Sequence, residues 1–174
     1  MPTELTKNAR IIVVDDEPMN VDLFGAILRD AGYANLVMIT DSRQAASTCA
    51  HDDPDLVLLD LHMPHQDGYE VLQSLRYLVP AEAFMPILVL TADVSVETRR
   101  RALAAGATDF LSKPFDVVEM TLRIETMIRL RFLYREMLKE KTMLEQRVRE
   151  RTRSLQRVIA ELRCTSLPLF TSHF

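Results

Sequence analysis

The sequence predicts an α/β fold, a doubly wound five-stranded parallel sheet with helices on each side, followed by a long C-terminal coiled-coil helix. Three observations predict it. Five short segments are apolar along their length, stretches with helical periodicity separate them, and the rear of the chain repeats apolar residues in heptads. Uniformly apolar strands are covered on both faces, and helical crossovers between strands give parallel pairing.

The five apolar runs are the predicted strands. Each is short and contains or precedes a polar residue at its end: ARIIVVDD (9–16), NLVMIT (35–40), DLVLLD (55–60), PILVLT (86–91) and TDFLSK (108–113). In an open parallel sheet, ligands bind at the carboxyl ends of the strands. The polar residues that end these runs are therefore candidates for a site.

Four helices are predicted between the strands, at 18–31, 42–50, 68–78 and 95–105. Pro18 suits the first turn of a helix, because its missing N–H would have no partner there. Gly32 and Gly106 suit positions just beyond a helix C-terminus, and Ser95 suits an N-terminal cap. These signals set the order strand, helix, strand throughout the front of the chain.

The rear of the chain predicts one long helix. Residues 116–164 contain neither Pro nor Gly and are rich in Leu, Met, Glu, Arg and Lys. A helix of about 45 residues is about 70 Å long, and it is stable only if its apolar stripe is covered. Steps of alternately three and four residues from Met127 reach an apolar or aromatic side chain at nine of eleven positions, with Lys141 and Arg151 as the exceptions.

This stripe predicts a parallel two-stranded coiled coil and hence a homodimer. Its predicted seam consists of Leu130, Tyr134, Met137, Leu144, Val148, Leu155, Val158 and Leu162. The alternative is that the stripe packs on the chain's own globular domain, but the stripe is longer than a domain of this size can cover. We expect a globular domain at 8–127, a dimerisation helix at 128–164 and an irregular tail at 165–174.

Charge also divides the chain into two parts. Residues 1–125 carry 10 Lys and Arg against 20 Asp and Glu, whereas residues 126–174 carry 11 against 5, within a total net charge of −4. The acidic front and the basic rear predict different roles. Nucleic-acid binding by the rear is not expected, because its charges alternate in sign and it lacks interleaved aromatic residues.

Composition excludes further classes of protein. Of the 174 residues, 48% are hydrophobic and 26% are charged, which is typical of a globular protein. No apolar run approaches the roughly 18 residues needed to span a bilayer, and the first residues lack the apolar core of a secretory signal. We expect a cytoplasmic protein without membrane association. Cys49 and Cys164 predict two reduced thiols, with no metal site and no disulfide.

Polar residues gather at the predicted carboxyl edge of the sheet: Asp15, Asp16, Asp60, Thr91 and Lys113. Each residue alone is compatible with an ordinary role in a loop, a helix cap or the surface. Five such residues at matching strand ends, in this order along the chain, favour a functional site instead. Crowded carboxylates repel one another, and Mg²⁺, which prefers oxygen ligands, removes that cost. A bound Mg²⁺ keeps Asp60 ionised as a nucleophile, while the Thr91 hydroxyl and the Lys113 ammonium can hold phosphoryl oxygens. The cluster predicts phosphoryl transfer to Asp60.

These motifs resemble the receiver domain of two-component response regulators, over about residues 8–127. VVDDEP carries the acidic pair, LVLLDLHMPHQDG the phosphoacceptor, LVLTA the threonine and DFLSKPF the lysine. The resemblance implies a flavodoxin-like fold and a phosphoryl group that Asp60 accepts from a phosphohistidine on a sensor histidine kinase or phosphotransfer protein. It also implies that Asp16 ligates Mg²⁺ directly, that Asp15 helps through a water, and that the backbone carbonyl of His62 is a further ligand.

The same resemblance implies how the switch moves. Thr91 and Lys113 would turn toward the phosphate, and the ring of Phe110 would swing into the space that Thr91 vacates. The peptide bond before Pro114 is expected to be cis, an uncommon isomer that helps to aim the lysine.

Two positions in this family tune how long the phosphate lasts, and here they are His62 and Asp93. They lie two residues after the phosphoacceptor and two residues after the threonine. We expect them to control the access and orientation of the hydrolytic water, with His62 as a loop residue rather than a catalytic base.

The output of the switch is less defined. LEQRVRERTRSLQ is similar to the connecting helix of HD-GYP-type regulators, and related connectors lead into diguanylate cyclases and histidine kinases. The leading interpretation is a phosphoacceptor switch, not an enzyme apart from its own dephosphorylation, that relays its state through a dimeric coiled coil. The alternative is the N-terminal regulatory part of a cyclic-di-GMP phosphodiesterase or diguanylate cyclase whose output domain is absent. A third interpretation, an inert structural coiled coil, requires that Asp60 take no phosphate.

Overall fold

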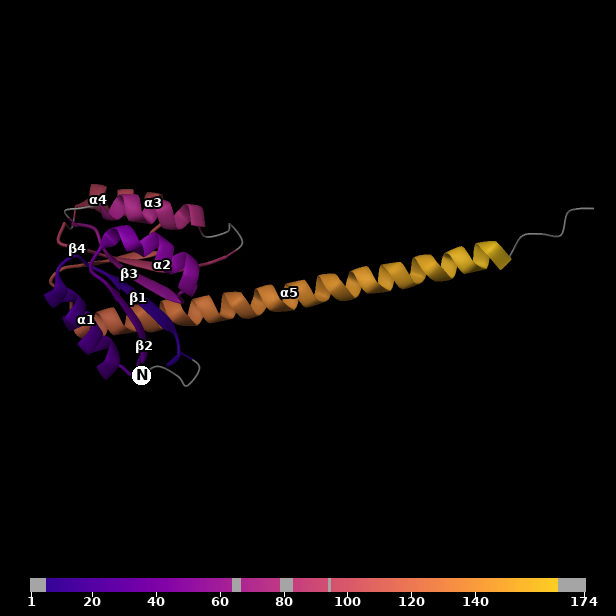
Figure 1. The fold of residues 1–174 in the computed structure, drawn as a ribbon, viewed down its shortest axis with the longest axis horizontal. Coiled ribbons are helices and arrows are strands. Elements are labelled where there is room, and N and C mark those ends of the chain that lie inside the picture. The colour runs from indigo at the N-terminus through magenta and orange to yellow at the C-terminus, as the bar shows by residue number, and fades with distance from the viewer. Residues whose placement is uncertain (1–5, 64–66, 79–82, 94, 166–174) are drawn as a thin grey trace, which may run out of the picture. The chain divides into compact units, whose positions relative to one another are not determined.

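The computed structural model describes residues 6–63, 67–78, 83–93 and 95–165, with backbone alone for the last two residues. The chain divides into two compact units, Met1–Arg135 and Glu136–Phe174. Figure 1 traces the elements in chain order, from indigo at the N-terminus to yellow at the C-terminus.

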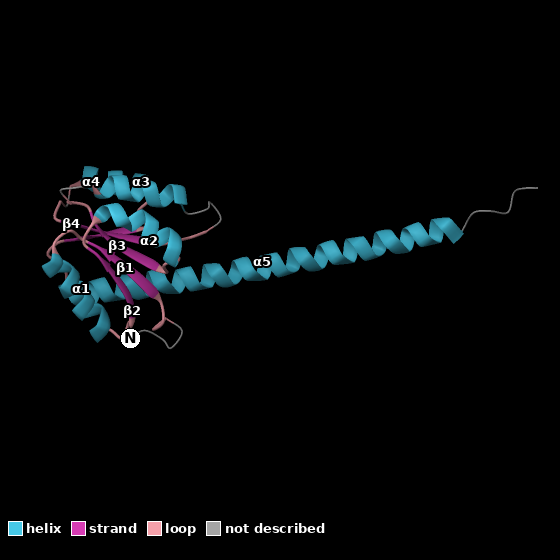
Figure 2. Ribbon diagram, viewed as in Figure 1, coloured by secondary structure: helices cyan, strands magenta, loops and turns pink. Residues whose placement is uncertain are grey.

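The first unit is built on a five-stranded parallel sheet, drawn in magenta in Figure 2. The strands are β1 (Arg10–Val14), β2 (Asn35–Ile39), β3 (Leu56–Asp60), β4 (Ile87–Thr91) and β5 (Asp109–Ser112). Their spatial order is β2-β1-β3-β4-β5, and every neighbouring pair is parallel. The predicted sheet and all five predicted strands are confirmed.

Helices cover both faces of this sheet. They are α1 (Pro18–Asp30), α2 (Ala45–Asp52), α3 (Gly68–Leu78), α4 (Val96–Ala105) and α5 (Val117–Thr165), with a short 3₁₀ turn η1 (Ser42–Gln44) before α2. Successive strand residues point to opposite faces, so each strand feeds two cores. One core packs against α2, α3 and α4, and the other packs against α1 and the first turns of α5.

The helix ends follow the local signals. Pro18 is the first residue of α1, and the Ser95 hydroxyl accepts a hydrogen bond from the Thr98 N–H at 3.2 Å to cap α4. Gly32 and Gly106 have φ of 95° and 118°, in the left-handed region that a glycine adopts without steric cost. These four expectations are confirmed.

The second predicted helix, at 42–50, differs in both its start and its end. The Asp41 carboxylate accepts the Arg43 N–H at 3.1 Å, and the first turn is 3₁₀ rather than α. The α-helix then continues to Asp52, and Asp53 closes it in a left-handed conformation with φ of 44°. Aspartate tolerates this conformation better than most residues, which is why a helix can end here without glycine.

The rear helix, α5, agrees with the predicted helical stretch of 116–164 to within one residue at each end, since it runs from Val117 to Thr165. The part that covers the sheet and the part with the heptad pattern are one continuous helix. The first compact unit ends at Arg135, beyond the predicted end of the globular domain at 127, and Ile128 still belongs to its core. The rest of the predicted tail lies outside the described residues.

Two expectations about the chain as a whole can be compared with the structure. Cys49 is a free, buried thiol whose pKa burial raises to about 12, whereas the side chain of Cys164 lies outside the described residues. Among the described residues, no helix combines the length and the apolar character that a membrane span requires.

Candidate functional site

The site lies at the carboxyl edge of the sheet, where β1, β3, β4 and β5 end. In the pairing of β1 with β3, Val14 stands beside Leu59, so the residues that follow them, Asp15 and Asp60, leave the sheet side by side. Thr91 ends β4, where it pairs with Ser112 of β5. Lys113 follows directly, so four strands deliver the predicted polar residues to one place.

Asp15, Asp16 and Asp60 form a compact group of carboxylates. One oxygen from each lies within 4.8 Å of the others. Asp15 is fully buried, Asp60 is 6% exposed and Asp16 is half-buried. Burial raises the pKa of Asp60, the Lys113 ammonium opposes that rise, and the Asp15 charge adds to it. An all-oxygen, anionic donor set of this kind fits Mg²⁺.

Lys113 is the cation of the site. Its Nζ lies 3.0 Å from Asp15 Oδ2 and 3.3 Å from Asp60 Oδ1. The Lys113–Pro114 peptide bond is cis, as the resemblance implied. One ammonium therefore sits between two buried carboxylates, and the group as a whole keeps a net negative charge.

Asn20, in the first turn of α1, was not predicted from the sequence. Its Nδ2 donates to both oxygens of Asp15, at 3.0 and 3.1 Å, and the Glu17 N–H donates to Oδ1 at 3.0 Å. Lys113 Nζ also donates to Asp15 Oδ2, so both oxygens of Asp15 accept hydrogen bonds within the protein. Asp15 is thereby held in one orientation, while Asp16 and Asp60 are the better-placed carboxylates to offer an oxygen to a cation.

Thr91 is almost fully buried, and its hydroxyl is engaged with the loop that follows. Thr91 Oγ1 accepts the Asp93 N–H at 3.1 Å. The Asp93 carboxylate is held in turn by the Thr98 hydroxyl at 2.5 Å and by the Ser95 N–H at 2.8 Å. These hydrogen bonds, that from Thr98 foremost, lower the pKa of Asp93. Asp93 therefore ties Thr91 to the first turn of α4.

Phe110 is half-buried against the core beneath α4, and the Arg99 guanidinium lies 4.8 Å from the centroid of its ring. Arg99 was not predicted, because its contact with Phe110 joins two separate elements, α4 and β5, and no local sequence pattern shows it. The inward movement of the Phe110 ring stays a prediction.

His62 is exposed and lies beside Asp93 at an open cleft of about 610 Å³. The cleft is lined by Leu61, His62, Met63, Asp67, Tyr69, Asp93, Thr98 and Arg101. The two positions expected to tune hydrolysis therefore line the same cleft, together with Leu61, the residue after Asp60.

Gly68, the first residue of α3, touches the backbone at the end of β3, the strand that carries Asp60. A Cβ placed on it would lie 2.5 Å from the Asp60 carbonyl oxygen and 2.6 Å from Leu61 Cα. Its N–H donates to the Leu61 carbonyl at 3.1 Å. Only glycine allows this approach, and the approach fixes the backbone on which Asp60 stands.

Comparison with known proteins covers the unit that carries the site. The family model of the response regulator receiver domain matches residues 11–125. Response regulator MprA of Mycolicibacterium vanbaalenii is 41% identical over 120 residues, which are 69% of this chain and 50% of MprA. The chain spans about half the length of the first curated relatives it matches.

Solved structures agree with the sequence match. The receiver domain of sensor histidine kinase PA1611 from Pseudomonas aeruginosa, determined with a magnesium ion coordinated in its active site cleft, is 30% identical with a TM-score of 0.63. The alignment covers 70% of this chain and 98% of that one. A protein described as a two-component system response regulator/GGDEF domain protein is 26% identical with a TM-score of 0.66, covering 73% of this chain and 51% of that one.

Proposed function

The chain belongs to the response regulator receiver family, and from that premise we propose that Asp60 accepts a phosphoryl group, with Mg²⁺, from the phosphohistidine of a sensor kinase or phosphotransfer protein. The observation that carries the proposal is the convergence of Asp15, Asp16 and Asp60 beside Lys113. A buried carboxylate whose pKa is raised is a poor nucleophile unless positive charge stands next to it.

The residues present fit a magnesium ion. Asp16 and Asp60 would hold it through carboxylate oxygens, with the backbone carbonyl of His62 as a further ligand, and Asp15 would act through a bound water. When bound, Mg²⁺ supplies positive charge that keeps Asp60 ionised and neutralises phosphoryl oxygens. Asn20 keeps Asp15 in the orientation that this arrangement requires.

The chain's own residues position and stabilise the transferred group. An Asp60 carboxylate oxygen forms the new bond to phosphorus as the bond from phosphorus to the histidine nitrogen breaks, and that nitrogen then takes a proton from water. Lys113, already 3.3 Å from Asp60 Oδ1, pairs with one phosphoryl oxygen. The Thr91 hydroxyl donates to another, which requires that it leave the Asp93 backbone it contacts here.

The stability of the acyl phosphate is set around the cleft. We propose that His62 and Asp93 control how water reaches the phosphorus, since both line the cleft that includes Leu61, the residue after Asp60. Because Ser95 and Thr98 hold the Asp93 carboxylate, Asp93 acts from a fixed position, whereas the exposed His62 is free to adjust.

Intact-mass measurement with a small phosphodonor tests the phosphoacceptor. We expect the wild-type chain to gain the mass of one phosphoryl group with Mg²⁺ and to gain none with a chelator. Asp60→Asn should gain none under either condition, because its amide is not a nucleophile. Phosphorylation of Asp60→Asn at the wild-type rate would place the acceptor elsewhere and contradict the proposal.

The helix beyond the receiver is the second element of the proposed function. In the second unit the seam residues expose half or more of their side chains, including Leu144 at 63% and Leu155 at 63%. An exposed apolar stripe of this length, interrupted at Lys141 and Arg151, indicates a partner helix. We propose that a second copy of the chain covers it, so that the phosphorylation state is relayed through a dimeric coiled coil.

Sedimentation of paired variants tests this dimer. Leu144→Lys places a charge in the seam and is expected to weaken self-association by tenfold or more, on the order of 1.5 kcal/mol or above. Gln146→Lys adds the same side chain two positions away, on the face of the helix that points away from the seam, and should leave association nearly unchanged. Equal association of both variants, or a wild-type chain that sediments as a monomer at high concentration, would reject the seam.

A second candidate function keeps the same switch but changes its output. The chain spans about half of its curated relatives, and the response regulator/GGDEF domain structure that it resembles is matched over 51% of its own length. These partial matches support a receiver that regulates a further domain, such as a cyclic-di-GMP phosphodiesterase or diguanylate cyclase. The phosphoacceptor chemistry is the same in both cases.

A further inference from the structure

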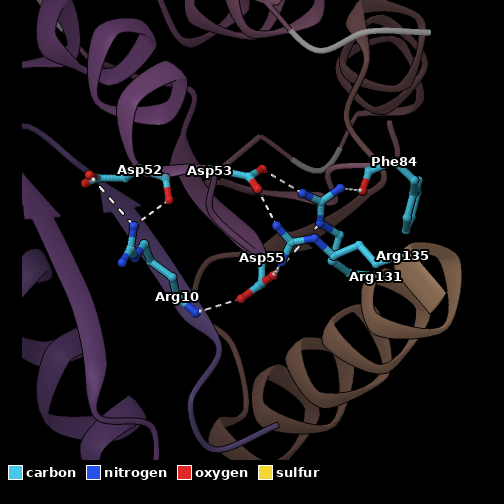
Figure 3. Close-up of polar contacts among 7 residues, drawn as sticks. All are labelled: Arg10, Asp52, Asp53, Asp55, Phe84, Arg131 and Arg135. Carbon is cyan, nitrogen blue, oxygen red and sulfur yellow. Dashed lines mark hydrogen bonds and ion pairs between the residues drawn. The ribbon is translucent and has the colours of Figure 1, made fainter. Parts of the chain in front are cut away.

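Two arginines of α5 meet two aspartates at the edge of the sheet opposite the phosphoacceptor. Arg131 and Arg135, one helical turn apart, face Asp53 and Asp55 on the loop between α2 and β3 (Figure 3). We call these four residues the clamp. All of them lie within the first unit, Met1–Arg135.

The clamp is densely connected. Arg131 donates through Nη2 to Asp53 Oδ1 at 2.8 Å and through Nη1 to the Phe84 carbonyl. Arg135 donates through Nη1 to Asp55 Oδ1 at 2.7 Å and through Nη2 to Asp53 Oδ2. Each Asp53 oxygen therefore accepts from a different arginine, so the two guanidinium groups share one carboxylate (Figure 3).

The clamp is also costly to build, which indicates that its geometry matters. Arg131 is 4% exposed, burial lowers its pKa, and its Nε finds no hydrogen-bond acceptor among the described residues, with Asp55 Oδ1 at 3.9 Å. A buried charge is tolerated only when its partners are held in place.

The clamp fixes the last turns of α5 in the first unit. The fully buried apolar residues of α5 end at Ile128; between that residue and Arg135, Arg131 is the only fully buried side chain, and Phe132 is partly buried against the same core. The ring of Tyr134 adds one contact, with its centroid 5.7 Å from that of Phe84. Tyr134, a predicted seam residue, is thus half-buried within the receiver.

The same residues anchor the strands that carry the phosphoacceptor site. Asp55 Oδ2 accepts the Arg10 N–H at 3.0 Å, and the Asp55 N–H donates to the Arg10 carbonyl at 2.8 Å. Arg10 opens β1, which leads to Asp15, and Asp55 directly precedes β3, which ends at Asp60. Both strands therefore start at the clamp and end at the site.

We propose that the clamp joins residues 128–135 of α5 rigidly to β1 and β3. Through this junction the phosphorylation state of Asp60 reaches the part of α5 beyond Arg135. This inference rests on the proposed phosphoacceptor function. A shift at the carboxyl end of a packed strand moves α5 only if the other end of the strand is rigidly bonded to α5. Where that contact is loose, the strand moves without displacing the helix. Arginine supplies the tie here because its planar fork bonds two carboxylates at once.

Hydrogen exchange of the full chain tests the rigid junction without phosphate. Arg135→Gln and Asp53→Asn remove charge while keeping a helix former and a residue that tolerates the left-handed conformation. Each is expected to speed amide exchange in 128–135 by about tenfold, and the double variant should do less than the product of the two single effects, because the Arg135–Asp53 ion pair is common to both. Arg129→Gln is the control, since its ion pair with Glu125 lies within α5. Unchanged exchange in both single variants would overturn the junction.

Phosphorylation then tests the relay. Wild type and Arg135→Gln are each treated with a small phosphodonor and Mg²⁺, and intact mass records the phosphate on each. We expect equal mass gains, a change in exchange over 136–163 in the wild type, and loss of that change in the variant. The same change in both chains would overturn the relay while leaving the phosphoacceptor intact, as would a wild-type mass gain with no change over 136–163. A wild type without mass gain would instead contradict the proposed function, on which the relay depends.

Discussion

Gly68→Ala is expected to cost about 2–3 kcal/mol of folding free energy and to abolish phosphoryl uptake at Asp60. The added Cβ would lie 2.5 Å from the Asp60 carbonyl oxygen and 2.6 Å from Leu61 Cα. Both are backbone atoms, so no rotamer change relieves the overlap, and the end of β3 must move. Denaturant unfolding measures the first effect and intact mass after phosphodonor treatment measures the second.

Gly25→Ala is the matched control. Its Cβ would also meet close atoms, Met38 Cε at 2.9 Å and Arg29 Nη1 at 3.1 Å, but both are the ends of flexible side chains. Alanine is favoured over glycine inside a helix by up to about 1 kcal/mol, which offsets the adjustment. A Gly68→Ala chain as stable and as readily phosphorylated as Gly25→Ala would show that the close approach does not hold Asp60 in place.

Lys113→Met is expected to destabilise the metal-free protein by about 3 kcal/mol. Lys113 is the cation shared by Asp15 and Asp60, and removing it leaves two buried carboxylates without their common partner. Added Mg²⁺ should restore much of the loss, because a divalent ion takes over the neutralisation. Thermal or denaturant unfolding with and without Mg²⁺ measures both effects.

Lys139→Met, at an exposed position of α5, removes the same charge away from the carboxylates and is expected to change stability by less than about 0.5 kcal/mol. The two variants should differ most in metal-free buffer. If Lys113→Met were as stable as Lys139→Met there, the carboxylates would not depend on the ammonium, and the electrostatic account of the site would fail.

The positions of the site residues could be predicted because the fold places strand ends together. Asp60 follows four apolar residues and Lys113 follows a predicted strand, so a parallel sheet brings them to one edge whatever the helices do. The helix starts at Pro18 and Ser95 could be predicted for the same reason, because each depends on the type of one residue at that position. Each of these features depends on a few consecutive residues, which is the information that a single sequence carries best.

The contacts between distant segments could not be predicted in this way. From the sequence, Arg131 and Arg135 would be assigned to the charged, exposed face of a long helix. In the structure they pair with Asp53 and Asp55, about 80 positions away along the chain. Both arginines belong to the first compact unit, which ends at Arg135. Heptad periodicity continues through this segment unchanged, so the pattern alone does not separate a side chain that packs on the receiver from one in the seam.

The central claim is that the crowded carboxylates form a cation site, and that the bound cation prepares Asp60 to attack phosphorus. Calorimetric titration with Mg²⁺ tests this claim most directly. The account predicts uptake of a single ion per wild-type chain, with affinity weakened on the order of tenfold or more in Asp16→Asn. Asp22→Asn, an exposed acidic residue of α1, should bind as the wild type does. Absence of uptake by the wild type, or equal affinity in Asp16→Asn, would contradict the account.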